Sequence, residues 1–209
     1  MLETLSGWFS FIEPKTVYLI FHLLGVVIGA GGAYMSDAIF FSTIKDREIN
    51  DTELRFIKLG SRMVWIGLLI LFISGLFLFS LDANKYIHSE KFLAKMTIVI
   101  ILTINGIFFH FVHIKRLFKH RDELIIWPNS FIKESRLLYP SGAISMVSWT
   151  SAIVLGAFKN IPWSYQTIML VYVGVIFTAI IVSFILRHRF LSPILPHRRH
   201  TKLQTPNSK

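Results

Sequence analysis

Five ionisable side chains stand inside or at the ends of long apolar stretches, where they could do chemistry: His22, Asp37, Lys95, His110 and His113. Ionisable groups inside a membrane-spanning segment are costly, so each is a candidate functional residue. Imidazole is a common metal ligand, whereas a carboxylate can pair with a cation or relay protons. Which of them can act together depends on the helices that carry them.

Those helices are predicted to cross a lipid bilayer. The chain of 209 residues is 53% hydrophobic and only 16% charged, and its mean hydropathy is +0.57. Soluble domains usually carry about 25% charged residues, and a span needs about 20 apolar residues as a helix. The sequence therefore predicts an all-α polytopic membrane bundle of about five transmembrane helices. The predicted spans are Tyr18–Phe41, Met63–Leu81, Phe92–Ile114, Ser141–Phe158 and Trp163–Leu186.

Basic residues predict the orientation of this bundle. Alternate connections carry five, six and six lysines and arginines, whereas the connections on the other side carry one, two and one. Because cytoplasmic connections of membrane proteins are enriched in Lys and Arg, the N-terminus is expected outside and the C-terminus inside. The net charge of +10 is then a topology signal, and no nucleic-acid partner is expected.

Three regions are expected along the chain. Residues 1–17 include Trp8, Phe9, Phe11 and Ile12 and are predicted to lie at the membrane interface. Residues 18–186 form the five-helix domain, and residues 187–209 form a basic cytoplasmic tail on lipid headgroups. The chain has no cysteine, which excludes disulfides and thiolate-bound metals.

Depth decides which of the candidate side chains can share a site. At 1.5 Å of rise per residue, His22 lies ~6 Å and Lys95 ~4–5 Å inside the outer edge of their helices. His110 lies ~27 Å from that edge, and therefore ~20 Å deeper than His22. His22 and Lys95 are thus expected in one layer, and a single haem held by His22 and His110 is excluded.

The first predicted span has a face of small residues next to His22. On a helical wheel, Gly25, Gly29 and Ser36 fall on the same side as His22. Such a face lets either a neighbouring helix or a flat cofactor approach closely. Both interpretations stay open for Gly25 and Gly29.

Simpler roles also stay open for the ionisable residues. Lys95 could extend its ammonium to the headgroup layer, and His110 could be an interfacial residue at a helix end. Asp37 and Arg62 are both expected near the cytoplasmic side, where they are predicted to form a structural ion pair in preference to a proton relay.

Three segments resemble the HemJ-type protoporphyrinogen IX oxidases and the related CopD-type copper-resistance membrane proteins. They are FHLLGVVIGAGG around His22, KFLAKMTIVIIL around Lys95 and GAFKN after the fourth span, and the likeness covers roughly residues 18–160. The resemblance implies a haem b held by the first-helix His and the third-helix Lys, here His22 and Lys95. The chain departs from the family in its fifth span, in Gly29 where the family has Trp, and in Asp37 where it has Arg.

The resulting expectation is a multi-pass protein of the bacterial inner membrane that binds haem or porphyrin and has a redox role. The cofactor-binding residues would be His22, Lys95, Gly25 and Gly29, with His22 and Lys95 as iron ligands. If the protein is an enzyme, it is a membrane oxidoreductase similar to protoporphyrinogen oxidases. A CopD-like transporter of copper or a small solute and a non-catalytic structural subunit are the alternatives, and a homo-oligomer stays open.

Overall fold

The computed structural model describes residues 13–46, 51–113, 129–159 and 161–191. Nearly all of these residues are helical, and none of them lies in a strand. The elements are α2 (Pro14–Asp46), α3 (Asp51–Leu81), α4 (Ala83–Ile87), α5 (Glu90–Phe108), the π-helix η1 (Phe109–His113), α7 (Asn129–Ala157) and α8 (Tyr165–Leu191).

Five of these helices, α2, α3, α5, α7 and α8, are long and apolar enough to cross a membrane, as predicted. Many of their large apolar side chains point away from the bundle. Leu170 of α8 is 75% exposed and Val27 of α2 is 68% exposed. Exposure of such large apolar side chains is costly in water and favourable in lipid. The all-α prediction for the bundle is therefore confirmed.

The helices run past the predicted spans. Helix α3 begins at Asp51 instead of Met63, with Asp51 and Glu53 in its first turn, where acidic side chains interact favourably with the helix dipole. Leu54 and Ile57 of this added part are buried at helical spacing. Hydropathy alone marks the apolar part of a helix and misses such amphipathic extensions.

Two predicted region boundaries also fall inside helices. Helix α2 begins at Pro14, so the end of the region 1–17 belongs to it, and α8 continues to Leu191, so the start of the region 187–209 is helical. Residues 1–12, with the predicted interfacial aromatic side chains, and residues 192–209 of the tail lie outside the described residues.

Helices α2 and α3 pack closely along their whole length through small residues. A Cβ added to Gly67 of α3 would lie 2.5 Å from the Cα of Gly29, and one added to Gly32 of α2 would lie 2.8 Å from the carbonyl oxygen of Gly60. Both distances are too short for real atoms. Glycines at these positions therefore let the two backbones touch.

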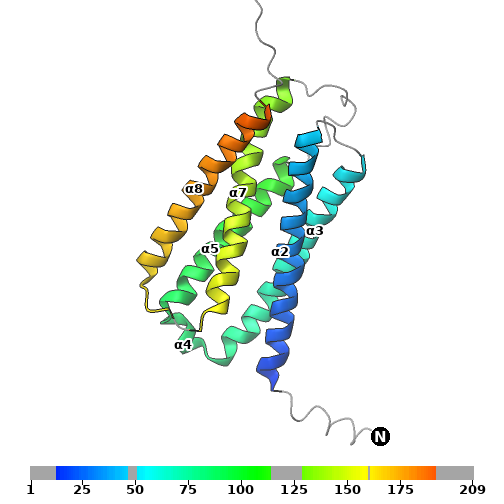
Figure 1. Ribbon diagram of the computed structural model, residues 1–209. Helices are drawn as coiled ribbons and strands as arrows, with labels where there is room; N and C mark the ends of the chain where they lie inside the picture. Colours follow the sequence, from blue (N-terminus) through cyan, green and yellow to red (C-terminus); the bar gives the residue numbers. More distant parts are fainter. Residues whose placement is uncertain (1–12, 47–50, 114–128, 160, 192–209) are drawn as a thin grey trace, which may run out of the picture.

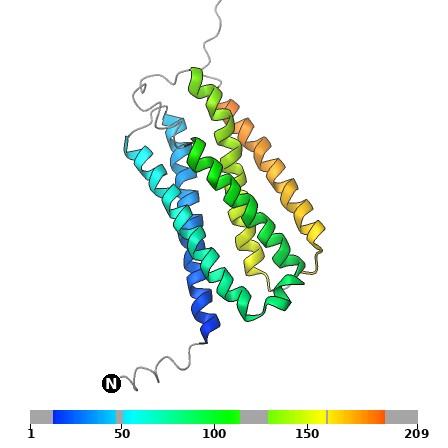
Figure 2. The ribbon, with the colours of Figure 1, turned by 180° about the vertical axis from the view of Figure 1, so that it is seen from behind.

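The five long helices form an up-and-down bundle in which α7 lies between α2 and α8 (Figure 1). Helices α2 and α3 make one closely packed pair, and α5, α7 and α8 pack on one another. Contacts between α2 and α7 join the two groups, whereas α3 and α5 make almost no direct contact along their length. Short α4 connects the ends of α3 and α5 (Figure 2).

Candidate functional site

A cavity of about 1330 Å³ lies between α3 and α5, where these two helices diverge. Its walls are stripes of side chains at helical spacing: Trp65, Leu68, Phe72, Gly75 and Phe79 on α3, and Phe92, Lys95, Val99 and Leu102 on α5. Residues three and four apart lie on one face of a helix, so each helix presents one face to the cavity. The volume exceeds the ~300–1,000 Å³ of common small-molecule sites.

His22 enters this cavity from α2, and a hydrogen bond fixes its ring. Its Nδ1 lies 3.1 Å from the hydroxyl oxygen of Ser74, and that hydroxyl donates to the carbonyl oxygen of Ile70 at 2.6 Å. A serine hydroxyl has one proton, so towards His22 it can only accept. Nδ1 of His22 therefore carries the proton, and in the neutral ring Nε2 keeps its lone pair. This tautomer suits a metal ligand.

Lys95 lines the same cavity from α5. Its Nζ lies 3.7 Å from the position that a Cβ on Gly156 of α7 would take, and no hydrogen bond of this amine occurs among the contacts of the described residues. His22 on α2 and Lys95 on α5 therefore line one cavity from two different helices. The structure thus brings the two side chains to one end of the bundle, as their depths in the sequence predict.

The residues at this end leave room for a large apolar ligand. The cavity is lined mostly by apolar side chains. The neutral His22 ring keeps the lone pair of Nε2, and the Lys95 amine has no hydrogen bond to any described residue. Gly75 faces the His22 ring, since a Cβ there would lie 3.7 Å from Cε1. Larger residues at Gly75 and Gly156 would fill the space beside the two candidate ligands.

Gly25 and Gly29, predicted to bind the cofactor, do not line this cavity. Gly25 packs on α3, where an added Cβ would lie 3.1 Å from the Gly67 carbonyl oxygen. At Gly29, an added Cβ would lie 2.4 Å from Cη2 of Trp149. Gly25 and Gly29 therefore allow close packing between helices and do not contact the cavity. The indole of Trp149, which belongs to α7, packs directly on Gly29.

His110 lies away from His22, towards the other end of the bundle. Its Nδ1 is 3.0 Å from the hydroxyl oxygen of Ser61, and its ring meets the edge of Trp65 with 6.3 Å between centroids. His110 belongs to the π-helix η1, whereas the side chain of His113 is not described. His110 does not line the cavity that holds His22 and Lys95.

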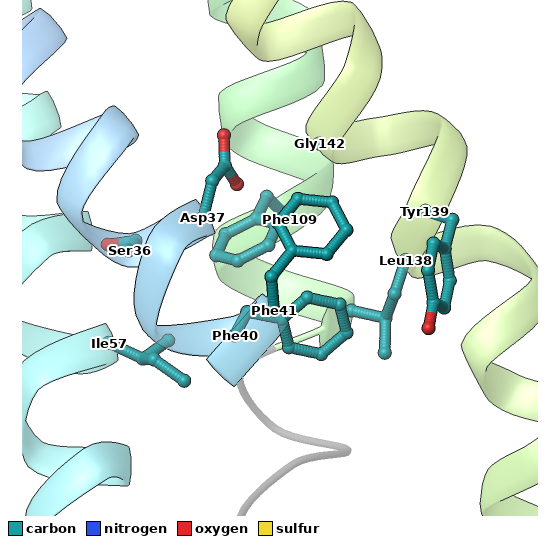
Figure 3. Close-up of a pocket in the computed structure, with 9 residues that line it drawn as sticks. All are labelled: Ser36, Asp37, Phe40, Phe41, Ile57, Phe109, Leu138, Tyr139 and Gly142. Carbon is teal, nitrogen blue, oxygen red and sulfur yellow. The ribbon is translucent and has the colours of Figure 1, made fainter. Parts of the chain in front are cut away.

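Asp37 and Arg62, the predicted ion pair, are not brought together. Gly60 of α3 faces α2, because an added Cβ there would overlap the Ser36 hydroxyl. Arg62 follows ~200° further around the helix and is exposed. Asp37 follows Ser36 by ~100°, so it points to α7 instead (Figure 3). There an added Cβ on Gly142 would lie 3.4 Å from Oδ1 of Asp37.

The Asp37 carboxylate is a second unusual group. Its Oδ2 is buried and has no hydrogen-bond partner among the described residues. It borders a cavity of about 10 Å³ lined mainly by Phe40, Phe41, Phe109 and Leu138. One water molecule needs about 10–15 Å³, so this space is far too small for a cofactor.

The sequence analysis, which considered mainly ionisable groups, did not identify two residues of the site, Ser74 and Trp149. Ser74 continues a series of small residues, Gly60, Gly67 and Ser74, spaced by seven along α3. Since seven residues make about two helical turns, these three residues lie on one face of α3. The spacing predicts that this face packs against a neighbouring helix, and it could have identified Ser74 from the sequence. Trp149 is 2% exposed and lines the cavity, but nothing in its local sequence indicates its contact with Gly29.

No protein-family model, no curated protein and no solved structure matches this chain. Among the described residues, no group of three or more His, Asp or Glu side chains could hold a metal ion.

Proposed function

We propose that this chain is a multi-pass protein of the bacterial inner membrane that binds haem b or a related porphyrin and has a redox role. The observation that carries the proposal is that His22 and Lys95 enter one large apolar cavity from two helices. The resemblance of the segments around both residues to HemJ-type oxidases points in the same direction.

Each residue has a distinct role in this proposal. His22 would hold the iron through Nε2, because Nδ1 is engaged by Ser74. Lys95 would hold the same iron as a neutral amine. Trp149 and the apolar faces of α3 and α5 would pack against the ring system. A bound haem would supply one-electron redox chemistry, and this chain's residues hold it and set its surroundings.

Copper transport has less support. Soft or imidazole ligands that hand copper across a membrane would have to recur along a path. In the described part of the chain His22 and His110 lie in separate environments, one against Ser74 and the other against Ser61. We therefore keep haem or porphyrin binding as the function that the geometry supports best.

The absorption spectrum of the protein purified in mild detergent tests the proposal. We expect a Soret band, either as isolated or after titration with haem, that saturates at about one haem per chain. Protein that is colourless and leaves the spectrum of added haem unchanged would contradict haem binding.

A further inference from the structure

Basic side chains surround the α4 end of the cavity. Four lysines line it, namely Lys85 on α4, Lys91 and Lys95 on α5, and Lys159 after α7, and they are accompanied by His22. Among the described lining residues the only carboxylate is that of Glu90. This carboxylate accepts a hydrogen bond from the backbone N–H of Tyr165. The mouth of the cavity therefore has an excess of cations.

The four lysines do not have the same surroundings. Lys91 donates to the carbonyl oxygen of Phe158 just beyond the end of α7, where cations are stabilising, so it has a structural role. Lys95 lies deeper, beside Gly156. Lys85 and Lys159 are exposed, and neither ammonium has a hydrogen bond or ion pair among the contacts of the described residues.

The rest of the cavity has the opposite character. Beyond the lysines, its walls are aliphatic and aromatic side chains such as Leu68, Phe72, Val99 and Leu102, and Trp149 packs beside them. A ligand that matches both parts has a large apolar body and anionic groups at one end. Electrostatic complementarity of this kind selects among ligands of similar shape.

We propose that Lys85 and Lys159 bind carboxylate groups on the cavity's ligand and orient these groups towards the α4 end. The proposal rests on the proposed function, since it concerns the same cavity. It adds two binding residues and an orientation, with the acidic edge of the ring system at the mouth and its apolar edge towards Trp149. His22 and Lys95 do not depend on these contacts for their own positions.

A pair of ligands that differ only in charge tests this inference. Iron protoporphyrin IX and its dimethyl ester offer the same iron and nearly the same shape, but the ester has no anionic groups. In nanodiscs of zwitterionic lipid, the wild-type protein should bind the acid about tenfold more tightly, the size expected of two exposed ion pairs. The Lys85→Gln/Lys159→Gln variant should bind both compounds with the affinity of the ester. Lys15→Gln, an exposed lysine of α2 that does not line the cavity, should leave both affinities unchanged.

The contrary outcomes separate this inference from the proposed function. Equal affinity of acid and ester for the wild-type protein overturns the role of the lysines and leaves haem binding intact. If anionic phosphatidylglycerol abolishes the difference and stabilises the wild type but not the double variant, the two lysines hold lipid phosphates, and the inference is again overturned. Failure of both compounds to bind overturns the inference and the proposed function together.

Discussion

Nδ1 of His22 on α2 and the hydroxyl oxygen of Ser74 on α3 are 3.1 Å apart, although 52 residues separate them along the chain. The Ser74 hydroxyl is itself tied to the Ile70 carbonyl, so it acts as a fixed acceptor. Ser74 thereby holds the His22 ring in the tautomer and orientation that leave Nε2 for a ligand in the cavity.

Removing this acceptor should weaken the ligand site without removing it. In Ser74→Ala, Nδ1 of His22 loses its hydrogen-bond acceptor. Loss of the hydrogen bond that orients a metal-binding histidine typically lowers the affinity for the metal about 10–100-fold. Haem titration measures the loss. Ser80→Ala on the same helix is the control. Among the described residues the Ser80 hydroxyl donates only to the Phe77 carbonyl oxygen, so this variant should bind haem with the wild-type affinity. Equal affinities for Ser74→Ala and Ser80→Ala would show that Ser74 does not position His22.

Lys95 should matter through its lone pair and not its charge. Lys95→Ala should still bind haem through His22, but with weaker affinity and a high-spin spectrum, since the iron would have lost one of its two protein ligands. Lys95→Arg should not restore the wild-type spectrum, because a guanidinium cannot deprotonate to bind iron. Magnetic circular dichroism of the two variants measures the spin state and the ligands of the haem iron. A wild-type spectrum in Lys95→Arg would exclude Lys95 as an iron ligand.

The contact between α2 and α3 should tolerate no side chain at Gly67. A Cβ there would meet the backbone of Gly29 at 2.5 Å, and overpacking of this kind costs about 1–3 kcal/mol. Gly31 of α2 is the control position, because an added Cβ there would meet nothing within 4 Å. Thermal unfolding in detergent should therefore show a lower Tm for Gly67→Ala and no loss for Gly31→Ala. A Tm that falls equally in both variants would mean that the helices do not pack as described.

Asp37 and Arg62 should behave as independent residues. The Asp37 carboxylate faces α7 and Arg62 is exposed, so the stability changes of Asp37→Asn and Arg62→Gln should add within about 0.3–0.5 kcal/mol in the double variant. A double-mutant cycle measured by unfolding in detergent provides the test. A coupling clearly beyond that range would support the ion pair expected from the sequence.

Much of the fold follows from the sequence because bilayer thickness sets a length that hydropathy detects. All five spans were predicted in this way, and so was the shared depth of His22 and Lys95, since helical rise converts residue number into distance. The residues that contact Gly25, Gly29 and Asp37 were not predicted from the sequence. These contacts depend on the rotation of each helix about its axis relative to its neighbours. A helical wheel describes one helix alone and gives no information on that rotation.

The orientation in the membrane remains a prediction from the distribution of basic residues. A reporter that is active only in the cytoplasm should give signal when fused after Lys209 and none when fused after Lys85. Signals in the reverse pattern would invert the topology and place the His22 cavity in the cytoplasmic half.

The absorption spectra of two histidine variants test the central claim most directly. His22→Ala should lose the Soret band of bound haem, because no other histidine lines the cavity among the described residues. His110→Ala should keep the wild-type spectrum, since His110 contacts Ser61 and Trp65 outside that cavity. Wild-type haem content in His22→Ala, or loss of haem in His110→Ala, would contradict the proposed site.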